Sequence, residues 1–114
     1  MKLARIIPAA LLLAAFTQSA NAAGMAMGAY ECWGNGEARM LMNFTVTGAG
    51  TYKGSDNSTG KFTLTGNTVT FTSGSLNGVM PDGFVAKYEI RKGIPTVSFV
   101  GPSGAEAQFC EHVK

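Results

Sequence analysis

The pattern that decides the fold is clearest in residues 61–72, which read Lys-Phe-Thr-Leu-Thr-Gly-Asn-Thr-Val-Thr-Phe-Thr. On both sides of the Gly66-Asn67 pair, large apolar residues alternate with threonines. A period of two places the apolar side chains on one face of a strand, and a Gly-Asn pair between two such runs is a hairpin signal. The stretch therefore predicts two antiparallel strands, 61–65 and 68–72, joined by a two-residue turn.

The same pattern continues along the rest of the chain. All 15 glycines follow residue 22, and they separate short runs rich in Thr, Val, Phe, Tyr and Ile, with no helical periodicity of useful length. We expect eight strands, at residues 28–33, 39–47, 50–54, 61–65, 68–72, 84–91, 96–100 and 106–111. Short connections favour a meander, so the fold class is all-β, a small eight-stranded antiparallel up-and-down barrel. A β-sandwich is the alternative, although no long crossover is visible.

Alternation also predicts which side chains fill this barrel. Most of the expected inward residues are large, so we favour a packed interior over a cavity for a ligand. The expected inward set is Met40, Met42, Phe44, Phe62, Leu64, Val69, Phe71, Phe84, Ala86, Tyr88, Ile90, Val97, Phe99 and Phe109.

Residues 1–22 have the features of a secretory signal peptide. Lys2 and Arg5 precede an apolar run that ends at Phe16, and Ala20-Asn21-Ala22 is a small-residue cleavage pattern. The run is too short to span a bilayer. We therefore expect cleavage after Ala22, one β-barrel domain at residues 23–114, no transmembrane segment after cleavage, and a periplasmic or secreted location.

Export changes the interpretation of the two cysteines. Cys32 and Cys110 lie near opposite ends of residues 23–114, and an isolated pair in an oxidising compartment is most simply a disulfide. Because the two residues lie on the first and last expected strands, the bond would fix the seam of the barrel.

Charge and composition argue against several classes of function. Residues 23–114 hold seven basic and seven acidic side chains, and no basic cluster exceeds Arg91-Lys92, so we expect no nucleic-acid partner. His112, close to the C-terminus, is the only histidine, the acids are scattered, and no nucleophile elbow is present. The polar loop at Asp56-Asn57-Ser58 has too few carboxylates for a calcium site. We expect no catalytic residues, no metal and no cofactor.

Two features are candidates for contact with a partner. The connection at residues 73–83 is the longest and carries Leu76, Val79 and Met80. It either folds over one end of the barrel, with Leu76 and Met80 as a plug, or presents an apolar contact surface. Trp33 either caps the core or serves as an exposed anchor.

The domain opens with Tyr30-Glu31-Cys32 and closes with Phe109-Cys110-Glu111. In this layout the chain resembles small exported β-barrel proteins of Gram-negative bacteria, and loosely the periplasmic inhibitors of c-type lysozyme, which are disulfide-stapled barrels. The inhibitory signature of that family, a Ser-Gly followed two residues later by Tyr, is missing. Ser73-Gly74 leads to Asn77, and Ser103-Gly104 leads to Ala107. No inhibitory residue is therefore carried over.

These observations lead to one expectation of function and two alternatives. We expect a non-catalytic, exported protein-binding or inhibitor module of the bacterial periplasm, with an extracytoplasmic protein as its partner and surface loops as its contacts. The alternatives are a structural or stress-related envelope protein without a discrete site, and a carrier of a small apolar ligand.

Overall fold

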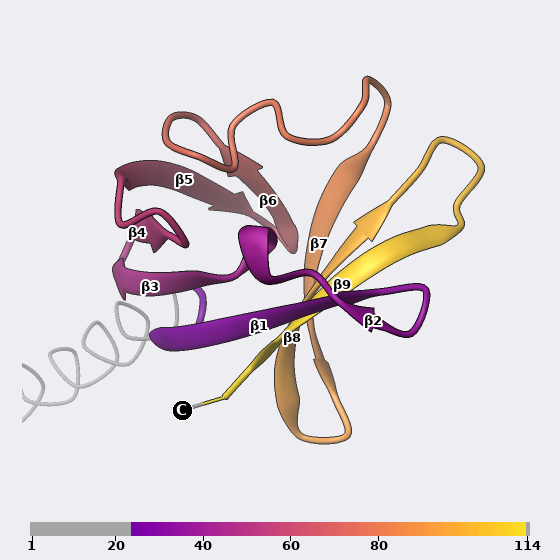
Figure 1. Cartoon of the computed structure of the whole chain (residues 1–114), viewed down its shortest axis with the longest axis horizontal. Helices are drawn as coiled ribbons and strands as arrows, with labels where there is room; N and C mark the ends of the chain where they lie inside the picture. The colour runs from indigo at the N-terminus through magenta and orange to yellow at the C-terminus, as the bar shows by residue number, and fades with distance from the viewer. Residues whose placement is uncertain (1–23, 114) are drawn as a thin grey trace, which may run out of the picture.

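The computed structural model describes residues 24–113, so the predicted signal peptide lies outside the described residues. Nine strands and one short 3-10 turn follow one another along the chain (Figure 1). They are β1 (Gly28–Gly34), β2 (Glu37–Ala38), η2 (Met40–Met42), β3 (Phe44–Gly48), β4 (Thr51–Gly54), β5 (Thr59–Thr65), β6 (Thr68–Phe71), β7 (Val85–Arg91), β8 (Ile94–Val100) and β9 (Glu106–His112).

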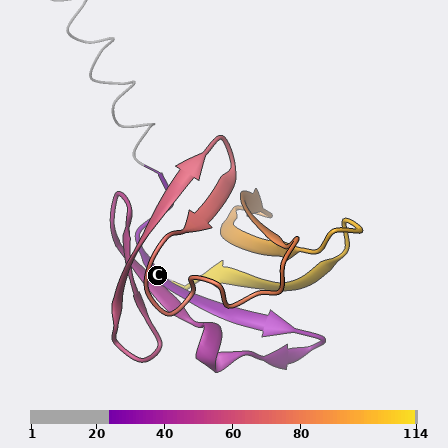
Figure 2. The ribbon, with the colours of Figure 1, turned by 90° about the horizontal axis from the view of Figure 1, so that it is seen from above.

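Eight of these strands close into an antiparallel barrel, which confirms the predicted fold class. From β3 to β9 each strand pairs with the next, and β1 pairs with both β3 and β9, which closes the sheet (Figure 2). The ninth strand, β2, only extends a hairpin on β1. Cys32 and Cys110 are direct register partners across the closing β1–β9 ladder, and they form the predicted disulfide.

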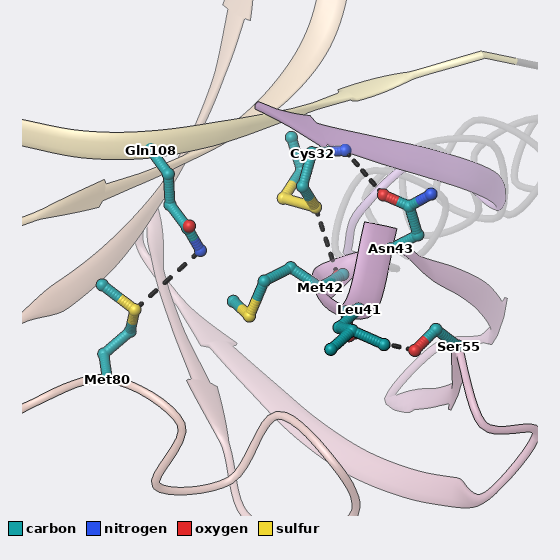
Figure 3. The surroundings of a disulfide bond; sticks show 8 residues. Cys32, Leu41, Met42, Asn43, Ser55, Met80 and Gln108 are labelled. Atoms are coloured by element: carbon teal, nitrogen blue, oxygen red, sulfur yellow. Dashed lines mark hydrogen bonds between the residues drawn. A yellow bond between two sulfur atoms is a disulfide. The ribbon is translucent and has the colours of Figure 1, made fainter. Parts of the chain in front are cut away.

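The predicted strand at 39–47 is wrong in its first half, which forms η2 instead. The N–H of Met42 donates to the carbonyl of Arg39, and the side chain of Asn43 accepts a hydrogen bond from the N–H of Cys32 at 2.8 Å. Figure 3 shows Asn43 reaching across to β1 in this way. The side chain of Asn43 thus takes the hydrogen bond from β1 that the main chain of a neighbouring strand would otherwise accept. The 3-10 turn η2, which precedes Asn43, projects outward. Met40, expected to face inward, is 69% exposed.

Aromatic rings fill the interior, in agreement with the expected packed core. Tyr30 stacks on Phe44 with their centroids 4.9 Å apart, and Phe71 contacts the rings of Phe44, Tyr52 and Phe99. Such ring pairs contribute beyond the area they bury. The buried hydrophobic residues are Met25, Tyr30, Cys32, Phe44, Val46, Tyr52, Phe62, Val69, Leu76, Ala86, Val97, Phe99 and Cys110.

Three further residues of the expected inward set lie outside the core cluster. One is Phe84, which precedes β7 and is partly buried. Ile90 is 59% exposed because it belongs to the end of the β7–β8 hairpin, where its register partner is Pro95. Phe109 precedes the buried Cys110, so strand alternation places it on the outer face. On that face the guanidinium of Arg91 lies over the Phe109 ring, 5.8 Å from the ring centroid.

The segment before β1 covers one end of the barrel. Met25 is buried, and the neighbouring Ala26 is held by two core tyrosines. Its carbonyl accepts a hydrogen bond from the hydroxyl of Tyr30 at 2.7 Å, and its N–H donates to the hydroxyl of Tyr88 at 3.1 Å. This end is therefore sealed by residues that follow directly on the expected cleavage site.

Candidate functional site

One hollow of the described residues lies between β6 and β7, beneath the connection at residues 72–84. These two strands share only two register pairs, Thr68 with Lys87 and Val69 with Ala86. Beyond Val69 the strands diverge, and the connection crosses above them (Figure 1). The result is an open cleft of about 300 Å³.

The start of the connection is fixed by Tyr52, which is fully buried on β4. Its hydroxyl donates to the carbonyl of Ser73 at 2.6 Å and accepts from the N–H of Leu76 at 2.9 Å. Burial raises the pKa of Tyr52, so the hydroxyl keeps the proton that it donates. Gly74, with φ +89°, lies so close that a Cβ atom there would be 2.5 Å from the Tyr52 oxygen. Only glycine suits this approach.

Most of the side chains that line the cleft are apolar, whereas polar and apolar atoms contribute equally to its exposed surface. Buried side chains form its base, and the connection and the start of β7 form its walls. Asp82 is the only charged residue among those that line it. The base consists of Val69, Leu76, Ala86 and Phe99, and the other lining residues are Thr68, Thr70, Phe71, Gly78, Val79, Met80, Pro81, Asp82, Gly83, Phe84 and Val85.

The three predicted residues of the connection meet at this cleft, where they have different roles. Leu76 is buried in the core, and Met80 packs against it. Figure 3 shows Met80 pointing toward Gln108 of β9, with 3.9 Å between its sulfur and the Gln108 amide nitrogen. Val79 is 41% exposed at the rim. Leu76 and Met80 thus cover the barrel, as one interpretation predicted, while Val79 remains available for contact, as the other required.

Trp33 is not part of this cleft. It lies between the buried Cys32 and Gly34, so it points outward from β1, beside its register partners Ala38 and Phe109. It is 38% exposed and does not cap the core.

Sequence reasoning missed the other wall of the cleft. The alternation of residues 68–72 predicts that Thr70 faces outward, and Val85 is not among the residues expected to face inward. Both line the hollow because the β6–β7 ladder stops after two pairs. Neither strand contains a glycine or proline that would have indicated the break.

Polar groups outside the cleft form local structure. Glu106 accepts hydrogen bonds from Arg91 and Ser98 on the outer face. Burial raises the pKa of this carboxyl, but the two donors outweigh burial and hold the pKa below its usual range. Asp56 accepts from the N–H of Ser58 at 3.0 Å, as expected of a polar turn.

Residues 24–113 contain no group of three or more His, Cys, Asp or Glu side chains that could hold a metal ion. The ring Nε2 of His112 lies 2.7 Å from the carbonyl oxygen of Met27, beside a shallower hollow of about 330 Å³ at Ile94 and Pro95. This hydrogen bond joins His112, at the end of β9, to the main chain just before β1.

Comparison with protein-family models, with curated proteins and with solved structures found no match. In the part of the chain that the structure describes, no helix has the length and apolar character needed to cross a membrane.

Proposed function

We propose that this protein is a non-catalytic, exported binding or inhibitor module of the bacterial periplasm, which contacts another protein through the cleft at residues 68–86. The observation that carries the proposal is this open cleft, most of whose side chains are apolar. Its rim exposes Val79 and Val85, at 41% and 43%, beside walls of Met80, Pro81 and Phe84. Apolar hollows with an exposed apolar rim are typical of contact sites.

The rigidity of this site supports recognition of a partner. Tyr52 fixes the connection at Ser73 and Leu76, and Leu76 and Met80 anchor it on the core. Little ordering entropy would therefore be lost on binding, and preformed sites bind more tightly for this reason. The proposal also includes removal of residues 1–22, which the disulfide supports, because such bonds persist in oxidising compartments.

A carrier of a small apolar ligand is the second candidate. A volume of about 300 Å³ is at the lower end of the range for small-molecule sites. The aromatic interior leaves this cleft, and not the barrel axis, as the place where such a ligand would bind.

The test is capture of partners from periplasmic extract on the immobilised protein with its disulfide intact. Val79→Asp places a charge at the rim and should abolish enrichment of the captured protein. Leu41→Asp is the matched control, because Leu41 is 86% exposed on η2 and does not line the cleft. Equal enrichment by both variants would contradict the cleft as the contact site. A small apolar molecule that co-purifies with wild type but not with Val79→Asp would favour the carrier.

A further inference from the structure

The edge of β6 that faces the cleft carries an unused main-chain pairing position at Phe71. The N–H of Thr72 donates to Lys61 on the β5 side, whereas the N–H of Tyr88 on β7 donates to the carbonyl of Asn67. In an antiparallel ladder, successive residues direct their main-chain groups to opposite edges. Asn67, Val69 and Phe71 therefore face β7, and Thr70 and Thr72 face β5.

Continuing the β6–β7 register would place Phe71 opposite Phe84, but that pair does not form. The N–H of Phe84 instead donates to the carbonyl of Pro81 at 3.3 Å, within the connection. Among residues 24–113, no main-chain hydrogen bond joins Phe71 to Phe84. The donor and acceptor of Phe71 are thus directed into the gap where the two strands have separated.

We propose that the cleft takes an extended peptide segment of a partner protein, which adds to β6 at Phe71 and inserts one large apolar side chain. This inference rests on the proposed function and specifies how the partner binds. Residues that exchange both hydrogen bonds in an antiparallel pair have side chains on the same face. Phe71 points into the core cluster, so the residue opposite it would point into the cleft.

The charge of the site specifies the residue beside that apolar anchor. Asp82 is exposed and is the only charged residue of the lining, so a basic side chain next to the anchor complements it. Within residues 24–113, no other segment of the chain pairs with Phe71 on this edge. Gly24, where the described residues begin, precedes Met25 at the barrel end that Tyr88 closes, whereas the cleft lies at the opposite end of β6.

Two measurements on the full exported protein with its disulfide intact test the inference. In the free protein, the amide of Phe71 should exchange with solvent faster than that of Val69, which is paired on the same edge. Equal protection of the two amides would overturn the free-edge argument. This measurement needs no ligand, so it does not depend on the proposed function.

The second measurement titrates 15N-labelled protein with the peptide Ac-Thr-Lys-Leu-Thr-Thr-NH2 and with versions that carry Phe or Trp in place of Leu. At least one should shift the amide signals of Phe71, Val79 and Phe84, with a dissociation constant of about 1 mM or lower. Methylating the amide nitrogen of the central residue should weaken binding roughly tenfold, because it removes one main-chain hydrogen bond. Glu in place of Lys should also weaken it.

The outcomes separate the two proposals. If Val79→Asp abolishes partner capture but the N-methylated peptide binds as well as its parent, the cleft is a binding site and strand addition is wrong. If none of the three peptides shifts these amide signals at a peptide concentration of about 10 mM, ten times the expected dissociation constant, strand addition is likewise overturned.

Discussion

The hydroxyl of Tyr52 accepts a hydrogen bond from the backbone N–H of Leu76 at 2.9 Å, although 24 residues separate the two along the chain. The same hydroxyl donates to the carbonyl of Ser73. One buried side chain of β4 therefore holds the start of the connection that covers the candidate site. The position of the cleft depends on a contact between distant parts of the sequence.

Tyr52→Phe should destabilise the protein by about 2–3 kcal/mol, because it leaves a donor and an acceptor unpaired in a site that Leu76 keeps dry. The measurement is urea unfolding of both proteins with the disulfide intact. The amides of Ser75 and Leu76 should also lose protection from hydrogen exchange. Unchanged protection there would show that the connection is held by other contacts.

Gly74→Ala should be clearly more destabilising than Gly78→Ala. Both glycines have positive φ, +89° and +75°, so both substitutions introduce backbone strain of about 1–2 kcal/mol. A Cβ atom at Gly74 would also lie 2.5 Å from the Tyr52 oxygen, whereas one at Gly78 would meet nothing within 4 Å. The difference between their free energies of unfolding isolates the steric contact. A difference near zero would contradict the close packing of Gly74 on Tyr52.

Replacing both cysteines, as Cys32→Ala with Cys110→Ala, should lower the free energy of unfolding by about 4 kcal/mol. The bond closes a loop with a sequence separation of 78 residues, and the chain-entropy model gives this magnitude for such a loop. Urea unfolding of wild type with and without a thiol reductant provides the comparison. Reduced wild type should resemble the double variant, and a midpoint that no reductant changes would contradict the expected role.

Acid should weaken the protein partly through Glu106, whose pKa is lowered in the folded state by its hydrogen bonds from Arg91 and Ser98. In the interval below the unfolded value of about 4.3, the unfolded chain binds more protons, so stability falls as the pH falls. The stabilisation from Glu106 is fully present above that value, and it is lost as the pH falls through the pKa of Glu106 in the folded state. Glu106→Gln should show a shallower loss of stability between about pH 5 and pH 3.

Ser98→Ala provides a comparison with Glu106→Gln. It removes one of the two donors to Glu106, so its loss of stability in acid should lie between those of wild type and Glu106→Gln. Identical pH profiles for all three proteins would show that the outer-face network does not contribute to acid sensitivity.

The local pattern of the chain determined most of the strands, the closed meander and the cysteine pair. Alternation with glycine-rich turns specifies strands residue by residue, as in 61–72, and short connections leave little choice of neighbour. The same reasoning located the connection with Leu76, Val79 and Met80. The strands and turns depend on residues that are close in sequence, so composition and period were sufficient to predict them. The closure and the disulfide join distant residues, and they could be predicted because the two cysteines lie on the first and last expected strands.

Tertiary structure alone decided where the pattern stops. Residues 39–42 continue a strand-like alternation, but Asn43 takes a hydrogen bond from Cys32 and the preceding residues turn outward as η2. The β6–β7 ladder ends after two pairs because the connection beyond it is held by Tyr52 and Leu76. Each outcome reflects competition between main-chain pairing and a contact with a distant residue, and a local period carries no information about that contact.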